Sequence, residues 1–165
     1  MEGLFAATPD EAVESVLLSD LASNKDYAML IWDCTSAFLH TPLKELVVAK
    51  PPAELCTTEN TRAIAFKAIP GLRRSAADWQ DHYFDDMVAS DDFERFRVEP
   101  CAMKNPKRRI KTVTHGDDTM STGQRTELKW LSQHVPQLFD VTMQQMISLH
   151  PEDAKEGTFL KNIVG

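Results

Sequence analysis

Three aspartates are the residues of this chain best suited to chemistry. Asp33 follows the apolar run Tyr27–Trp32, and Asp117 and Asp118 stand together between two segments rich in threonine. Carboxylates that meet at one place repel one another and raise each other's pKa. A divalent cation removes that repulsion, because Mg²⁺ binds a few carboxylates together with water and substrate phosphates. Two such ions about 4 Å apart activate an attacking oxygen and stabilise a leaving one, so the pattern predicts phosphoryl transfer.

The elements that carry the aspartates decide whether they meet. The predicted elements from 27 to 143 follow the order β-α-β-β-α-β, with the stretch 43–73 inserted between the first strand and its helix. This is the split β-α-β, ferredoxin-like pattern, an α+β fold with one antiparallel sheet and helices on one face. We expect the first and second core strands to be neighbours, which brings Asp33 to the Asp117–Asp118 turn. The alternative is an ordinary turn, because Asp side chains readily bond the local backbone.

Capping and breaking residues predict the helix boundaries. Thr8 is expected to start the first helix through a capping box with Glu11. A helical stripe over 126–135 is expected to end at Pro136, because proline removes a backbone donor. Residues 100–123 are expected to form two strands around basic and acidic turns.

Composition excludes several classes of protein. The chain of 165 residues is 42% hydrophobic, which is enough for a core. It has no apolar run of the roughly 18 residues that a membrane helix needs. The N-terminus lacks a basic segment followed by an apolar one, so we expect no secretory signal and an intracellular location, cytoplasmic or nuclear. The three cysteines are widely spaced, which argues for reduced thiols and against a zinc knuckle or disulfide framework.

The charge is strongly uneven along the chain. A net charge of −7 argues against a domain whose whole surface grips nucleic acid, because phosphate binding relies on lysine and arginine. Residues 104–111 nevertheless hold five basic side chains in eight positions. This basic run is either a solvated hairpin tip or a contact for phosphate.

Five segments stand in an order and at a spacing that match one known family. They are Asp33–His40, resembling D-V-x-x-A-F-L-x; Leu43 to Pro52, resembling L-x-x-x-I-Y-M-x-x-P-P; Gly71–Trp79, resembling G-L-K-Q-A-P-R-x-W; Glu99–Met103, resembling D-P-C-L-F; and His115–Asp118, at the place of Y-V-D-D. Together they resemble the reverse transcriptase of copia-type (Ty/copia) retrotransposons. The resemblance implies a reverse transcriptase palm over 27–165 with a partial fingers insertion at about 43–73, after an N-terminal helical segment over 1–26.

The resemblance also implies roles for single residues. Asp33, Asp117 and Asp118 correspond to the catalytic carboxylates that bind two Mg²⁺ or Mn²⁺ ions, with Asp118 the more peripheral ligand. Phe38 corresponds to an aromatic gate, because a flat ring under the ribose leaves no room for a 2′-hydroxyl. The other nucleotide-binding residues that it implies are Gly71, Arg73 and Arg74. The implied partners are an RNA template, a DNA or RNA primer and a deoxynucleoside triphosphate, with no membrane. The plainer alternatives are that Phe38 is an ordinary core aromatic and that the turn Gly71–Ser75 is simply the entrance to a helix.

The chain departs from the family pattern near its aspartates. His115 and Gly116 replace the tyrosine and valine of Y-V-D-D, and a glycine there is expected to loosen the turn. Ala76 and Ala77 stand where the family has A-P. We expect the thumb and RNase H domains to be absent, so the isolated chain should be weakly active or inactive. The alternative function is a non-catalytic, decayed palm remnant or interaction module, whose uncovered apolar surface favours self-association.

Overall fold

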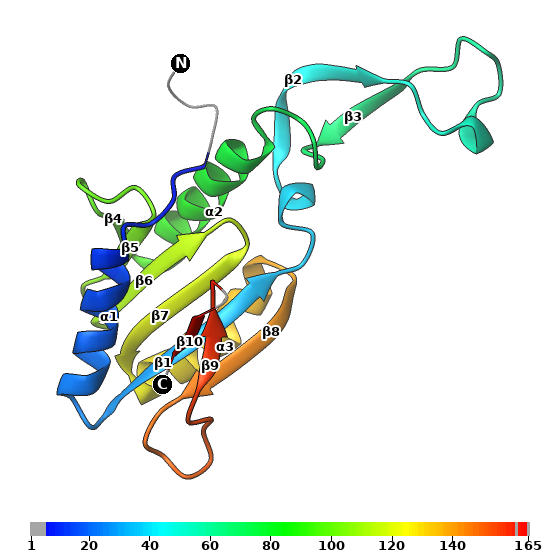
Figure 1. Cartoon of the computed structure of the whole chain (residues 1–165). Helices are drawn as coiled ribbons and strands as arrows, with labels where there is room; N and C mark the ends of the chain where they lie inside the picture. The colour runs from blue at the N-terminus through cyan, green and yellow to red at the C-terminus, as the bar shows by residue number, and fades with distance from the viewer. Residues whose placement is uncertain (1–5, 161, 165) are drawn as a thin grey trace.

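A six-stranded antiparallel sheet organises the computed structural model, which describes residues 6–160 and 162–164 (Figure 1). Its strands are hydrogen-bonded in the order β4 (Glu94–Arg95), β5 (Ala102–Asn105), β6 (Ile110–His115), β7 (Asp118–Gln124), β1 (Tyr27–Cys34) and β8 (Val141–Ile147). A separate hairpin consists of β9 (Gly157–Phe159) and β10 (Asn162–Val164). The strands β1 and β7 therefore lie inside the sheet, with paired neighbours on both sides.

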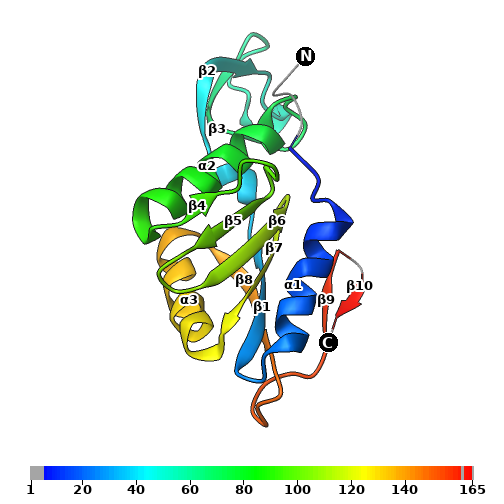
Figure 2. The same ribbon diagram turned by 90° about the vertical axis from the view of Figure 1, so that its left-hand side faces the viewer.

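Helices cover both faces of this sheet. The helices α2 (Ser75–Asp91) and α3 (Arg125–Leu138) lie on one face, as predicted for the core helices (Figure 2). The helix α1 (Glu11–Ser23) packs on the opposite face together with the β9–β10 hairpin (Figure 2). The sheet is thus the middle of three layers, with a hydrophobic cluster on each side of it.

The strand β1 divides its side chains between these two clusters. Side chains alternate between the faces of a strand. Those that enter the core under α2 and α3 are Ala28, Leu30, Trp32 and Cys34. Met29 and Ile31 enter the cluster under α1. By the same alternation Asp33 belongs to the α1 face, one strand position beyond a fully buried segment.

The succession of elements agrees with the predicted β-α-β-β-α-β order, with two differences. The segment 100–123 holds three strands rather than two, because β5 precedes the basic turn. The expected pairing of the first two core strands is wrong, because β1 pairs with β7, the third core strand. The strands β6 and β7 form a tight hairpin, and only one of them can lie beside β1. The aspartate pair still reaches β1, since it stands in the turn that joins both strands.

Two predicted helix boundaries are also wrong. Asp10, and not Thr8, caps α1, because its carboxylate accepts the backbone N–H of Ala12 at 2.8 Å. Pro136 does not end α3, which continues to Leu138. Most helical stability in proteins comes from packing of the apolar face, and the buried face of α3 holds its last turn against the sheet despite the proline.

The segment inserted before α2 forms an arm that projects from the sheet (Figure 1). After the 3₁₀ turn η1 (Ala37–His40), β2 (Pro42–Ala49) pairs only with β3 (Ala63–Lys67), and the turn η2 (Ala53–Leu55) lies between them. Its large exposed apolar side chains are Leu46, Val48, Leu55, Ile64 and Phe66, with exposed fractions from 53% to 77%. The arm occupies nearly the same stretch of chain as the insertion expected at about 43–73.

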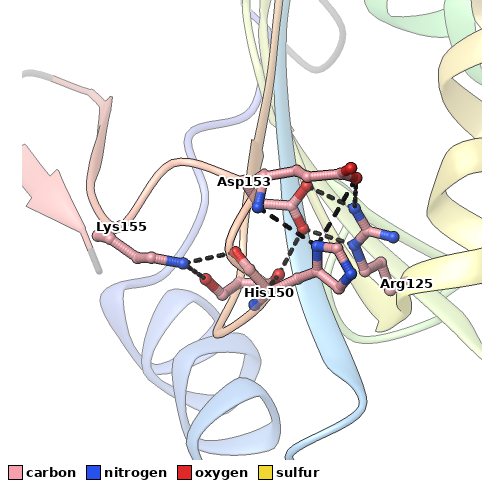
Figure 3. A network of polar contacts seen from close by, with 6 residues as sticks. Arg125, His150, Asp153 and Lys155 are labelled. Atoms are coloured by element: carbon pink, nitrogen blue, oxygen red, sulfur yellow. Dashed lines mark hydrogen bonds and ion pairs between the residues drawn. The ribbon is translucent and has the colours of Figure 1, made fainter.

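A buried carboxylate fastens the loop after β8 to the start of α3 (Figure 3). Asp153, whose side chain is 7% exposed, accepts bonds from Nε and Nη2 of Arg125 at 2.6 and 2.8 Å. The Ser148 hydroxyl donates to the same carboxylate. Lys155 Nζ donates to the carbonyls of Ser148 and His150 at 2.9 and 2.6 Å. The bidentate pairing of Arg125 with Asp153 is charge-assisted, and hydrogen bonds of this kind are the strong ones. The pair therefore orders the loop.

Replacement of Asp153 by asparagine is expected to lower the free energy of unfolding at pH 7 by roughly 2 kcal/mol, because hydrogen bonds to charged groups are being lost. The bond from Arg125 holds the pKa of Asp153 well below its ordinary value of 3.8. Its contribution is therefore complete above pH 3.8 and is lost as the pH falls from there toward the folded value. Urea unfolding of wild type and Asp153→Asn at pH 7 and at pH 3 measures the difference in their free energies of unfolding. Equal stabilities at pH 7 would contradict the role of the pair.

Candidate functional site

Two of the three aspartates face each other across neighbouring strands. Asp33 on β1 is the register partner of Asp118 on β7. Side chains of directly opposite residues point to the same face, with Cβ atoms about 4.5–5.5 Å apart. Both side chains are half-buried and lie at the end of the sheet where the β6–β7 turn meets β1. The strand register therefore places Asp118, rather than Asp117, opposite Asp33.

The turn that carries Asp117 is anchored from two directions. The carbonyl of Asp117 accepts the backbone N–H of Cys34 at 3.2 Å. The carbonyl of Gly116 accepts the indole Nε1–H of Trp79, from α2, at 2.8 Å. Gly116 has a φ of +65°, which favours glycine, and a Cβ there would meet open space. Glycine at this position thus supplies the backbone conformation of the turn, and the expected loosening is offset by the two anchors.

The three carboxylates bring like charges close together. Burial raises the pKa of Asp118 above its usual range, the nearby charges of Asp117 and Asp33 raise it further, and His115 opposes them. In the part of the chain that the structure describes, no salt bridge involves any of these three carboxylates. Like charges held together without a cationic side chain favour binding of a cation.

The donor set fits a magnesium ion, although it is not a closed coordination shell. Among residues 6–160 and 162–164, no three His, Cys, Asp or Glu side chains are placed to hold one metal ion. Mg²⁺ is usually bound by one or two carboxylates and completes its shell with water and substrate phosphates. The facing pair Asp33 and Asp118 meets that requirement, with Asp117 beside it in the turn.

A pocket of about 240 Å³ opens beside the aspartate turn. Phe38 and Leu39 of η1 line it on one side, and Gly116 and Asp117 of the turn line it on another, with Pro70 nearby. The ring of Phe38 is half-buried and packs on the core under α2 and α3. Phe38 is therefore both a core aromatic and a wall of the pocket that contains Asp117.

The other predicted nucleotide-binding residues lie outside this pocket. Gly71 has a φ of +93° and forms the turn that leads into α2. Arg73 and Arg74 line a second pocket of about 390 Å³, between the start of α2 and the arm. Arg74 is paired with Asp78 at 3.2 Å. The structure thus places Asp33 opposite Asp118, places Asp117 and Phe38 in one pocket, and places both arginines in a separate pocket.

Most cationic side chains of the basic run 104–111 form ion pairs with carboxylates of the same chain. Four of its cationic side chains pair with carboxylates: Lys104 with Glu94 at 3.5 Å, Lys107 with Asp92 at 2.7 Å, Arg108 with Glu127 at 2.6 Å, and Lys111 with Asp20. The guanidinium of Arg108 also lies 3.6 Å from the ring centroid of Trp130. These contacts favour the solvated hairpin over a phosphate contact for this run.

Sequence reasoning missed two residues that contact the site. Trp79 entered the sequence analysis only as the last residue of the segment Gly71–Trp79, with no role of its own, yet its indole bonds the aspartate turn. Thr142 on β8 had no recognised role, yet its hydroxyl bonds the Asp33 carboxylate at 2.8 Å. The tryptophan itself is a usable signal, because a buried indole N–H usually finds an acceptor. Thr142 carries no comparable signal.

A retrotransposon polyprotein is among the known proteins whose sequences are similar to this chain. No family model and no solved structure matches the chain. Over 85 residues, 52% of this chain, the sequence is 28% identical to the transposon Ty1-NL2 Gag-Pol polyprotein of Saccharomyces cerevisiae. The matched stretch spans 5% of the length of that polyprotein. The similarity supports an origin of the chain in a Ty1/copia-type retrotransposon. Each described helix is too short or too polar to cross a membrane.

Proposed function

We propose that the chain carries the palm, with part of the fingers, of a copia-type RNA-directed DNA polymerase. The observation that carries the proposal is the facing pair of Asp33 and Asp118 beside a pocket lined by Asp117 and Phe38. A retrotransposon polyprotein is among the proteins that the sequence resembles, and an origin in such an element agrees with the proposed activity. The fold is then a palm, and the β2–β3 arm is the partial fingers insertion.

In the proposed reaction, the primer 3′-oxygen attacks the α-phosphate of a deoxynucleoside triphosphate and pyrophosphate leaves. Bound Mg²⁺ ions would supply activation of the attacking oxygen and neutralisation of the leaving one. The chain contributes position and charge. Asp33 and Asp118 provide the facing carboxylates, and Asp117 adds a third carboxylate residue that lines the pocket. Phe38 presents its ring to the same pocket, where it would lie under the ribose.

A second candidate is a non-catalytic palm remnant. The observation that favours it is the lack of a closed three-ligand cluster among the described residues. A remnant keeps the sheet and its core, but it binds neither metal ion nor nucleotide at the turn. Nucleotide binding therefore separates the two functions.

Binding of dUTP and UTP, which differ only at the 2′ position, each with Mg²⁺, tests the proposed polymerase site by calorimetry. The wild-type chain is expected to prefer dUTP, and Phe38→Ala is expected to reduce that preference by about tenfold, since pocket shape typically discriminates 10- to 200-fold. Phe66→Ala, on the exposed arm, is the matched control and should keep the preference. Equal affinities of the wild type for both nucleotides would argue against the gate, and no binding of either would favour the remnant.

A further inference from the structure

A β-bulge interrupts the pairing of β1 and β8 beside the carboxylate pair. Asp33 lies opposite Met143, and Cys34 lies opposite Val141, so Thr142 is an extra residue on β8. The strand β8 is an edge of the sheet. Bulges bend the strand that carries them and re-aim a side chain, and they are frequent at sheet edges and next to active sites.

The extra residue directs its hydroxyl at the first aspartate. Thr142 Oγ1 donates to Oδ2 of Asp33 at 2.8 Å and lies 3.3 Å from the backbone carbonyl of the same residue. In regular pairing, residue 142 would point to the face opposite that of Asp33, because side chains alternate along a strand. The bulge is therefore what makes this contact possible. In the described part of the chain, no other side chain hydrogen-bonds the Asp33 carboxylate.

We propose that Thr142 is a positioning residue for the metal site, an inference that rests on the proposed function. Its hydroxyl fixes the rotation of the Asp33 carboxylate by holding Oδ2, and it leaves Oδ1 for a cation. Groups that orient a metal ligand typically contribute 10- to 100-fold to metal affinity. The preorganised carboxylate faces Asp118 without first having to be ordered by the ion.

The affinity for Mn²⁺, measured by calorimetry on the whole chain, tests this role with two substitutions. Thr142→Val keeps the β-branched shape but removes the donor, and it is expected to weaken Mn²⁺ binding about tenfold. Thr142→Ser keeps the hydroxyl and should restore most of the wild-type affinity. Thr158→Val, at an exposed position of β9, is the matched control and should bind like wild type. Because Thr142 is exposed, the thermal midpoints of all variants should agree closely.

The possible results separate this inference from the proposed function. Weak binding by Thr142→Val with rescue by Thr142→Ser supports the positioning role. Wild-type affinity in Thr142→Val overturns it and leaves the polymerase proposal standing. Equal weakening in both variants also overturns it, because the hydroxyl would then not be the group responsible. A wild-type chain that binds no Mn²⁺ overturns the metal site itself and the positioning role with it.

Discussion

Replacement of Trp79 by alanine is expected to lower the free energy of unfolding by about 4 kcal/mol, as is typical when a buried tryptophan is truncated. The side chain is 1% exposed, and its ring centroid lies 5.6 Å from those of Tyr83 and Phe139. The loss is a large share of the roughly 5–15 kcal/mol that stabilises a folded domain. Thermal unfolding should show a midpoint lowered by roughly 10 °C.

The variant Trp79→Phe separates the packing of this residue from its hydrogen bond. Phenylalanine keeps most of the apolar burial but leaves the Gly116 carbonyl without its indole donor. The expected destabilisation is about 1–3 kcal/mol, and Mn²⁺ affinity should fall because the turn bearing Asp117 loses an anchor. Trp130→Phe on α3, away from the turn, should leave Mn²⁺ affinity unchanged. Unaltered Mn²⁺ affinity in Trp79→Phe would limit Trp79 to a packing role.

Replacement of Asp118 by asparagine is expected to have opposite effects without and with metal ions. Burial, followed by the charges of Asp117 and Asp33, raises the pKa of Asp118 above 3.8. The folded protein then holds this proton more tightly than the unfolded chain, so stability falls as the pH rises from 3.8 through the folded value. At pH 7 without metal, the uncharged asparagine should therefore make the variant more stable than wild type.

Metal ions should reverse that order. At about one hundred times its dissociation constant, Mn²⁺ stabilises a protein that binds it only when folded by about 2.7 kcal/mol. Wild type should gain this amount, and Asp118→Asn should gain little. Thermal unfolding in Mn²⁺ and in a chelator measures both effects. A wild-type midpoint that does not respond to Mn²⁺, or a variant that responds equally, would contradict a metal site at the facing pair.

Periodicity and chain order were enough to predict much of the site. The apolar run before Asp33 is long enough for a central strand, and the aspartate pair interrupts a β-branched hairpin. In this order of elements, the end of β1 reaches the turn of the β6–β7 hairpin whether β6 or β7 pairs with β1. The meeting of Asp33 with the turn was therefore predictable, even though the pairing partner was predicted wrongly.

The remaining features depend on contacts between distant residues. The bulge at Thr142 is a difference of one residue in the pairing of β1 and β8, and no hydrophobic period encodes it. Arg73 and Arg74 adjoin the arm because of how the insertion packs against α2. The ion pairs of the basic run reach from its hairpin to α1, α3 and the β4 region, where only the folded chain brings their carboxylates.

Calorimetric titration with Mn²⁺ of the wild-type chain and of Asp33→Asn tests the metal site most directly. Asp26→Asn is the matched control, because Asp26 is an exposed aspartate just before the opposite end of β1. Wild type and Asp26→Asn are expected to bind Mn²⁺ equally, and Asp33→Asn is expected not to bind it. No binding in the wild type, or equal binding in all three proteins, would mean that the facing aspartates do not form the metal site of a polymerase.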